Sequence, residues 1–277
     1  MNALRDKVQH QYGKLLANYN RDLAKKDALE VIVTKYSGVI LLAATDLQDR
    51  VWHLCERQAK AQNPVLKMKN IDEIAYPMWP MTKKHYLHST IYLFAKYFCW
   101  VEILRRDIQF LNFGDDKKTN DFNYFLKKIE RCLAETGLKN FLNPGTNISS
   151  DRPIFQLMQT EIGESLIVEE GALKQCMMYW NYIETIDDFL NKSSAYKALE
   201  ALLEGAMGDY KTKFHLTRLR LLNNALVELI NFLNDHNRLL IVDEVKELAC
   251  PGFDLKAYQE KWSGIYLSNV QQPEEAS

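Results

Sequence analysis

Residues 85–113 read HYLHSTIYLFAKYFCWVEILRRDIQFLNF, and apolar or aromatic side chains occupy nearly every helical face of this stretch. A helix that is apolar all round lies at the centre of a protein, with other elements packed around it. Gly114 follows directly and is a natural residue to end the helix. The stretch therefore predicts a central helix that ends near Gly114, with the rest of the chain folded around it.

Outside this helix, the prolines indicate where other helices stop, because proline costs about 3 kcal/mol in a helix interior. Three blocks of the chain contain none, namely residues 1–63, 81–143 and 154–250. They predict helical segments joined by loops near residues 62–82, 114–120, 143–152 and 249–253.

Apolar periodicity then predicts individual helices, with approximate bounds of 3–27, 29–60, 121–135, 153–168, 172–190 and 195–207. A longer helix follows, in which leucines keep heptad spacing over two heptads, at Leu219, Leu222, Leu226, Leu229 and Leu233. Two heptads are too short for a free coiled coil and predict a seam inside a helical bundle. Residues 239–242 fit either a short strand or the start of another helix.

Composition supports the same class. The chain has 277 residues, 47% of them hydrophobic, but only 11 glycines and 7 prolines. All-β folds need a turn signal about every 8–12 residues, which so few glycines and prolines do not supply. The large apolar content excludes collagen-like and disordered classes. We predict an all-α, single-domain bundle of seven to nine helices over residues 1–268, with a disordered tail at 269–277; an N-terminal arm at 1–27 is compatible with this pattern.

Charge gives no general reason to expect nucleic acid or anionic lipid as a partner. The 35 lysines and arginines balance 36 acidic residues, for a net charge of −1. The first 26 residues are locally basic, with an excess of four positive charges from Arg5, Lys7, Lys14, Arg21, Lys25 and Lys26 over Asp6 and Asp22. This face is either simply solvated or a docking surface for an anionic partner.

The cysteines and the lengths of the apolar runs indicate the cellular compartment of the protein. The five cysteines are widely spaced and form no Cys-x-x-Cys pair, which is typical of unpaired thiols in a reducing compartment. We find no apolar secretory segment near Met1 and no run of the 18 or so residues that would cross a bilayer. The sequence predicts a cytoplasmic protein without a transmembrane segment.

Motifs that would name a reaction are missing. No histidine follows an acidic residue by three positions, as a ferritin-like di-iron site requires. His85 and His88 are better explained by capping or packing than by a metal, and Asp187-Asp188 by a solvated helix end. The sequence contains no phosphate-binding glycine loop and no Gly-x-Ser-x-Gly elbow. We therefore predict no metal and no cofactor, and the sequence leaves open whether the chain is an enzyme.

A polar stripe interrupts the central helix. Glu102, Arg105, Arg106 and Gln109 follow helical spacing and so share one face. Leaving such groups buried without partners would cost several kcal/mol each, so they should meet opposite charges from other helices.

Two other predicted helices offer those charges. One carries Asp46, Asp49 and Arg50, and another carries Glu161 and Glu164 on either side of Gly163. A glycine lets another backbone approach closely, which would bring these glutamates within reach of the arginines. We predict a buried network that joins three helices, with Arg105 or Arg106 bidentate to Glu164 or Asp46.

This network has two interpretations. It fixes the register of the helices, or it lines a ligand or active site together with Tyr92 and Trp100. A solvent-accessible pocket larger than about 300 Å³ that is lined by these charges would favour a site, whereas a buried and mutually satisfied network would favour structure. The candidate residues are Asp46, Arg50, Tyr92, Trp100, Glu102, Arg105, Arg106, Gln109, Glu161 and Glu164.

Several of these residues lie in segments that resemble a family of uncharacterised bacterial proteins, many of which join a membrane-spanning N-terminus to a helical cytosolic domain. The resemblance covers about residues 36–182 and rests on AATDLQDR at 43–50, YFCWVEILRRDIQFL at 97–111, Gln159 and Ile162-Gly163-Glu164. The chain differs from the pattern at Cys99, where a glycine is usual, at Thr160-Glu161, where an Arg-Ala pair is usual, and in lacking the membrane segment. The resemblance implies a shared fold and polar network and names no reaction.

Three functions stay open from the sequence. The leading hypothesis is a non-enzymatic interaction or regulatory protein, of a stress or phage-defence kind, that acts through its basic N-terminal helix or by self-association. The second is an enzyme or small-ligand binder that uses the Glu/Arg stripe. The third is a metal-independent ribonuclease built on Arg5 and His10, whose five-residue spacing occurs in helical ribonucleases.

Overall fold

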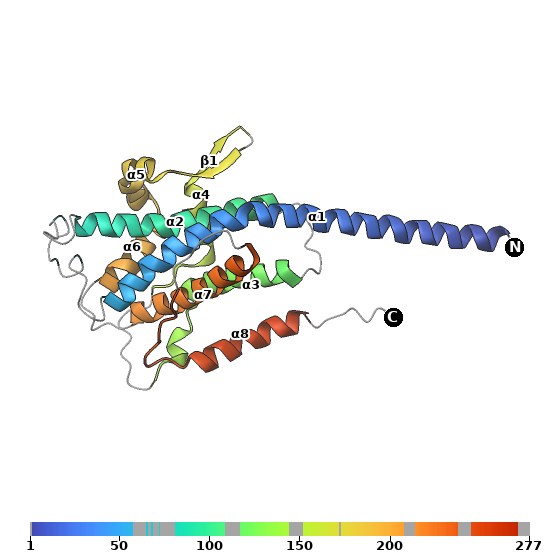
Figure 1. Cartoon of the computed structure of the whole chain (residues 1–277). Helices are drawn as coiled ribbons and strands as arrows, with labels where there is room; N and C mark the ends of the chain where they lie inside the picture. Colours follow the sequence, from blue (N-terminus) through green and yellow to red (C-terminus); the bar gives the residue numbers. More distant parts are fainter. Residues whose placement is uncertain are drawn as a thin grey trace.

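The computed structural model describes residues 2–57, 65, 68, 72, 81–108, 117–143, 152–171, 173–207, 214–237 and 245–270. Within these residues the chain forms α-helices and one small hairpin, which confirms the all-α class (Figure 1). The helices are α1 (Asn2–Trp52), α2 (Lys83–Ile108), α3 (Lys117–Ala134), α4 (Gln156–Ser165), α5 (Tyr179–Lys192), α6 (Ser194–Met207), α7 (Phe214–Asn237) and α8 (Leu255–Val270). A π-helical turn, His53–Arg57, follows α1, and a 3-10 turn, Leu138–Phe141, follows α3.

Helix α2 lies at the centre, as its sequence predicts. More than half of its side chains are buried, and it packs against α1, α4, α5 and α6. On the other side of α1 lies α7, which also contacts α3. The five heptad leucines of α7 are all buried, so the prediction of a bundle seam is confirmed.

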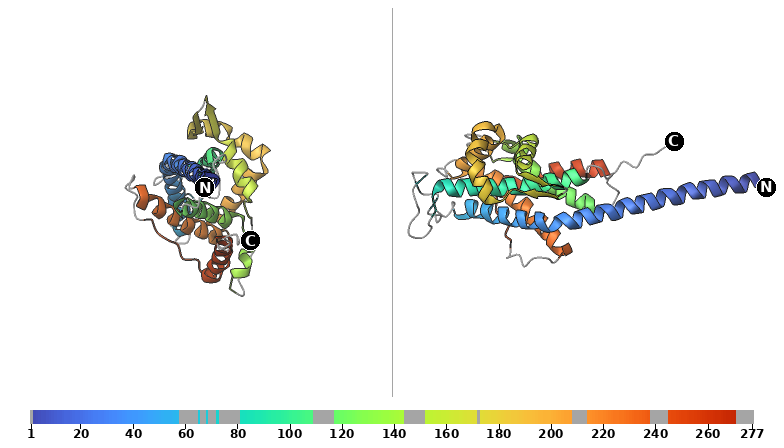
Figure 2. Two further views of the ribbon diagram at one scale, coloured as in Figure 1. Left: turned by 90° about the vertical axis from the view of Figure 1, so that its right-hand side faces the viewer. Right: turned by 90° about the horizontal axis from the view of Figure 1, so that it is seen from above.

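Helix α1 runs without a break for 51 residues, where the sequence analysis placed two helices, at 3–27 and 29–60. The predicted break is wrong because Lys26-Asp27-Ala28-Leu29 contains neither glycine nor proline and continues a helix readily. Only the second half of α1 packs on the bundle. The first half extends away from the rest of the molecule as a single helix (Figure 2).

A two-stranded hairpin replaces the predicted ends of two helices at 153–168 and 172–190. Strand β1 (Ile167–Glu170) pairs antiparallel with β2 (Leu173–Cys176), and Ile167 lies opposite Cys176. Gly171 has a φ of +63°, which glycine adopts at little cost, and it directly follows β1 and does not end a helix. The side chains on this hairpin are at best half-buried, so no strong apolar period marks it in the sequence.

Helix α8 was not anticipated, because the sequence analysis assigned no element between residue 253 and the predicted tail. It begins after Gly252, which has a φ of +75°, and Tyr258 packs on Phe141 and Phe253. The end of the central helix at Gly114, residues 239–242 and residues 271–277 lie outside the described residues. All five cysteines are free, and no helix in the described part of the chain is both long and apolar enough to cross a bilayer.

Candidate functional site

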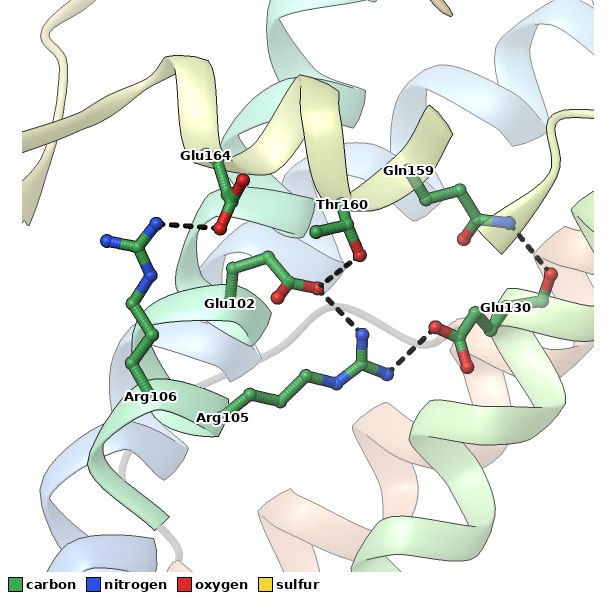
Figure 3. Close-up of polar contacts among 7 residues, drawn as sticks. All are labelled: Glu102, Arg105, Arg106, Glu130, Gln159, Thr160 and Glu164. Atoms are coloured by element: carbon green, nitrogen blue, oxygen red, sulfur yellow. Dashed lines mark hydrogen bonds and ion pairs between the residues drawn. The ribbon is translucent and has the colours of Figure 1, made fainter. Parts of the chain in front are cut away.

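The polar stripe of α2 meets α3 and α4 near the end of α2. Glu102, Arg105 and Arg106 lie on consecutive turns, so their side chains leave the same face of a helix that is otherwise apolar. Figure 3 shows Glu102 and Arg105 between Thr160 of α4 and the carboxylate of Glu130 of α3, and it shows Arg106 on the far side of Glu102, reaching Glu164 of α4. The stripe thus lies where three helices converge.

Arg105 joins two carboxylates. Its Nη1 donates to Glu102 Oε1 at 2.7 Å, and its Nη2 donates to Glu130 Oε1 at 2.9 Å. Thr160 of α4 also donates to Glu102 Oε1, at 3.2 Å. Glu102 and Glu130 are 8% and 9% exposed, so these ion pairs are largely shielded from water. Burial alone would lower the pKa of Arg105, but the two carboxylates outweigh it and raise that pKa.

Arg106 forms a second, more exposed pair on the same face. Its Nη2 donates to Glu164 Oε1 at 2.7 Å, and its Nη1 lies 3.6 Å from Glu169 Oε1 on β1. The hydrogen bond from Arg106 to Glu164 is the main reason that the pKa of Arg106 is raised. The predicted contact between Arg106 and Glu164 is present, although through one hydrogen bond and not in the bidentate form.

Gly163 brings α4 against α2. A Cβ atom at Gly163 would lie 2.8 Å from the carbonyl carbon and oxygen of Phe98, and 3.0 Å from Cγ of Glu102. These distances are below ordinary van der Waals contact, so only glycine allows this approach. The close backbone contact that the sequence predicts at Gly163 is confirmed. Gln159, one turn earlier, is buried and donates to the backbone carbonyls of Glu130 and Ile154.

Asp107, the next residue along α2, ties two further elements to this end of the bundle. Its carboxylate accepts a hydrogen bond from Tyr36 of α1 at 2.5 Å and another from Lys174 of β2 at 3.1 Å. Burial would raise the pKa of Asp107, but these hydrogen bonds outweigh it and lower that pKa. Tyr36 is also the point at which α1 begins to be buried, so the projecting half of α1 leaves the body beside this site.

A pocket of about 400 Å³ borders the two ion pairs. Glu102, Arg105, Arg106 and Glu164 form its charged side, and the other lining residues are Leu104, Ile108, Asn123 and Leu126. Arginine stays protonated at any physiological pH, so its role here is to position and neutralise charge and not to transfer protons. The pocket has the size and the mixed polar and apolar lining of a small-ligand site.

Other predicted members of the network lie elsewhere. Asp46 pairs with Lys96 at 2.8 Å and does not reach the arginines. Arg50 donates to Ser89 and Thr90, at the opposite end of α2, and stacks on Tyr86. The prediction that α1 supplies a charge to the network is therefore wrong for both residues, because α1 crosses α2 with these positions on other turns.

The remaining candidates are also dispersed. Tyr92 donates to the carbonyl of Met177 and belongs to an aromatic cluster with Tyr179 and Tyr182. Trp100 packs half-buried against the core. Glu161, which was expected near the arginines, instead accepts a hydrogen bond from Ser193 at 2.5 Å. Gln109 lies outside the described residues.

The structure describes the side chain of only one of the two residues on which the ribonuclease hypothesis depends. His10 is exposed on the projecting half of α1. The side chain of Arg5 lies outside the described part of the chain. Among the described residues no three His, Cys, Asp or Glu side chains come together in a way that would hold a metal ion.

Sequence reasoning missed Arg218, which is the largest fully buried side chain among the described residues. It lies on α7, and its guanidinium donates to the carbonyls of Cys132, Leu133 and Glu135 at 2.7–2.8 Å. These carbonyls end α3, where unpaired acceptors and the helix dipole favour a cation. One signal was present: Arg218 precedes Leu222 by four residues and so shares the face of the leucine seam.

A buried amide pair was also missed. Gln48 of α1 donates to Asn223 of α7 at 3.0 Å, and Asn223 in turn donates to the carbonyl of Lys246. Both side chains are almost fully buried. The pair fixes the register of α1 on α7.

No protein-family model matches the chain, and neither a curated protein nor a solved structure matches it.

Proposed function

We propose that the chain is a cytoplasmic, non-enzymatic interaction protein that binds an amphipathic helix of a protein partner along the projecting half of α1. The proposal rests on a stripe of large apolar side chains on α1, which no other part of the described structure covers. The stripe consists of Tyr12, Leu15, Leu16, Tyr19 and Leu23, each between 47% and 71% exposed. We call this set the α1 stripe. The five free cysteines favour the cytoplasmic location.

The α1 stripe occupies one side of the helix. At about 100° per residue, its five members fall within an arc of about 100°. Single exposed leucines are normal on a protein surface, but a contiguous apolar patch marks an interaction site. In proteins, most of the stability of a helix comes from packing of its apolar face against another element. Packing of the stripe on a partner would therefore stabilise the projecting half of α1, and the stripe provides the surface for that contact.

An overlapping side of α1 packs on the bundle further along. Ile40, Ala44, Leu47 and Val51 are fully buried. At about 100° per residue, Ala44 and Val51 fall within the arc of the α1 stripe, and the other two fall within about 40° of its edge. Helices α2 and α7 are what α1 contacts there. A partner helix on the stripe would extend this helix-on-helix packing beyond the body, which is why we assign a helix as the occupant.

Two basic residues of this segment point away from the stripe. Lys14 and Arg21 lie about 150–180° from its centre, on the opposite side of α1. A partner that covers the stripe therefore leaves both basic residues in solvent, and this arrangement is compatible with an apolar protein partner.

A photo-crosslinking amino acid tests the proposal in the cells that produce the protein. We expect Leu16→p-benzoylphenylalanine, on the stripe, to form covalent adducts with protein on irradiation. Ala17→p-benzoylphenylalanine is the matched control, because Ala17 is exposed on the far side of the same helix. Adducts should be at least about tenfold more abundant at position 16, and equal or absent adducts at the two positions would refute this function.

A second candidate function, binding of a small ligand, is favoured by one observation: the pocket beside Arg105 and Arg106 exceeds the volume that we set as the criterion for a site. Its charged side and its apolar residues fit a small molecule with an apolar body and a polar head, such as a short-chain carboxylate or amine. Whether or not this pocket is used, the interaction function does not depend on it.

Ligand-induced stabilisation tests the second candidate. At 100 times its Kd, a ligand raises the free energy of unfolding by about 2.7 kcal/mol, which is a rise of about 5–10 °C in Tm for a chain of this size. We expect one of a panel of C4–C8 carboxylates and amines to produce such a rise in the wild type, and Arg106→Met to remove it. Arg152→Met, an exposed arginine outside the pocket, is the control. A flat response of the wild type to the whole panel would count against a ligand site.

A further inference from the structure

When Val8 is added from the sequence, the positions of the α1 stripe read the same from either end. Its five members are Tyr12, Leu15, Leu16, Tyr19 and Leu23, and the sequence places Val8 four residues before Tyr12. The order is aliphatic, tyrosine, leucine, leucine, tyrosine, aliphatic, with spacings of four, three, one, three and four residues. The centre of this symmetry lies between Leu15 and Leu16.

We infer that the occupant of the α1 stripe is a second copy of this chain, bound antiparallel. This inference rests on the proposed function and names the partner of the same surface. A two-fold axis between Leu15 and Leu16 would set Tyr12 of each copy opposite Tyr19 of the other, and Leu15 opposite Leu16. Each contact then occurs twice, which is the defining property of a two-fold dimer interface. A stripe that binds an unrelated helix has no need for this internal symmetry.

The residues beside the stripe permit such a pair. The described side chains on its two edges are neutral and polar, namely Gln9, Gln11, Asn18 and Asn20. Between positions 9 and 22, the axis therefore sets no carboxylate opposite a carboxylate and no lysine or arginine opposite another, and the amides are able to hydrogen-bond between copies. Beyond the ends of the stripe, the same axis pairs the sequence positions of Arg5 and Lys26, which carry like charge. Lys14 and Arg21 stay on the outer side of each helix, away from the second copy.

The antiparallel arrangement also leaves room for the two bodies. About 20 residues separate the centre of the stripe from Tyr36, where α1 meets the bundle, and a helix rises 1.5 Å per residue. The bodies would thus lie roughly 60 Å apart, at opposite ends of the paired helices. The projecting half of α1 in Figures 1 and 2 runs clear of the rest of the described chain, so the second copy can reach the stripe.

Mass measurement tests whether the partner is a second copy. Purified full-length protein should sediment and scatter light at about twice its chain mass of 32.3 kDa. The variants Leu15→Glu and Leu16→Glu each place two carboxylates in the seam, and each should raise the dimer Kd at least about 100-fold. Ala17→Glu adds the same charge on the far side and should leave the Kd within about twofold. Circular dichroism of each variant checks that the bundle stays folded.

Cysteine crosslinking tests the orientation. In an antiparallel dimer, a mixture of the Tyr12→Cys and Tyr19→Cys variants forms a disulfide between copies on mild oxidation, and neither variant does so alone. A parallel dimer gives the reverse, because each new cysteine then faces its own equivalent. Wild-type protein controls for the five native cysteines, of which Cys55, Cys99 and Cys132 are buried.

Two results would overturn the inference. One is a parallel crosslinking pattern. The other is a monomeric mass for the wild type up to about 100 μM, whether or not the protein binds anionic vesicles instead. Failure of the self-association leaves the proposed function testable by itself. Adducts at position 16 with a different protein would support a heterologous partner, whereas no adducts at position 16 would refute both.

Discussion

Arg218→Met is expected to lower the free energy of unfolding by about 3–5 kcal/mol. Arg218 is fully buried, and it supplies hydrogen bonds to three carbonyls at the end of α3. Methionine fills a similar volume without any donor. The carbonyl of Leu133 would keep its bond from Ile154, but those of Cys132 and Glu135 would lose the donor that Arg218 provides. Urea unfolding measures the loss, and a fall of about 10 °C in Tm should accompany it.

Two further variants test whether Arg218 stabilises the protein through its hydrogen bonds to the end of α3 or only through its positive charge. Arg218→Lys keeps the charge, but a single ammonium group does not reproduce the fork that reaches three carbonyls, so it should recover less than half of the loss. Lys127→Met removes an exposed cation from α3 and should change stability by less than about 0.5 kcal/mol. If Arg218→Met unfolded at the same urea concentration as the wild type, the guanidinium would have no capping role.

Gly163→Ala is the second large effect, at about 2–3 kcal/mol of destabilisation. The added methyl group would lie 2.8 Å from backbone atoms of Phe98, which do not rotate away as a side chain end does. Helix α4 would have to move outward from α2. The hydrogen bonds from Thr160 to Glu102 and from Arg106 to Glu164 cross that contact, so both should weaken.

Gly38→Ala is the matched control. Gly38 also lies within a helix, on α1, and a Cβ there meets no other atom within 4 Å. Alanine is the better helix former, so Gly38→Ala should stabilise the protein by about 0.5–1 kcal/mol. The two Gly→Ala variants are thus expected to have opposite signs in thermal unfolding. A stabilised Gly163→Ala would show that α4 does not contact α2 as closely as described.

The sequence predicts some elements well because their signal is local. Helix α2 is apolar on nearly every face, and α7 repeats leucine at heptad spacing, so the burial of both helices follows from periodicity alone. The hairpin at 167–176 was missed because two strands of four residues, with half-buried or exposed side chains, carry no periodic signal. The single break placed in α1 was wrong because a helix that projects into solvent has no packing pattern to mark its continuity.

The candidate site was also predicted only in part from the sequence. The stripe of Glu102, Arg105 and Arg106 follows from helical spacing, and Gly163 flanked by glutamates identified the helix that meets it. Glu130 was not predicted, although it takes half of the hydrogen bonds of Arg105 to carboxylates, because the packing of α3 on α7 and α4 sets which turn of α3 faces the stripe. Asp46 and Arg50 were misassigned for the same reason, since the turn of α1 that faces each turn of α2 depends on how the two helices cross.

By itself, the sequence determined that this is a helical protein, which helix is central, and which polar residues share a face of that helix. These properties depend on residues a few positions apart, whose relative directions the helix geometry fixes. Only the tertiary structure decided which carboxylates the arginines contact and that Arg218 of α7 caps the end of α3. It also decided that no element of the described chain covers the α1 stripe. Those properties depend on the angles and offsets at which helices pack, and these are set by the sum of many side-chain contacts across the whole bundle.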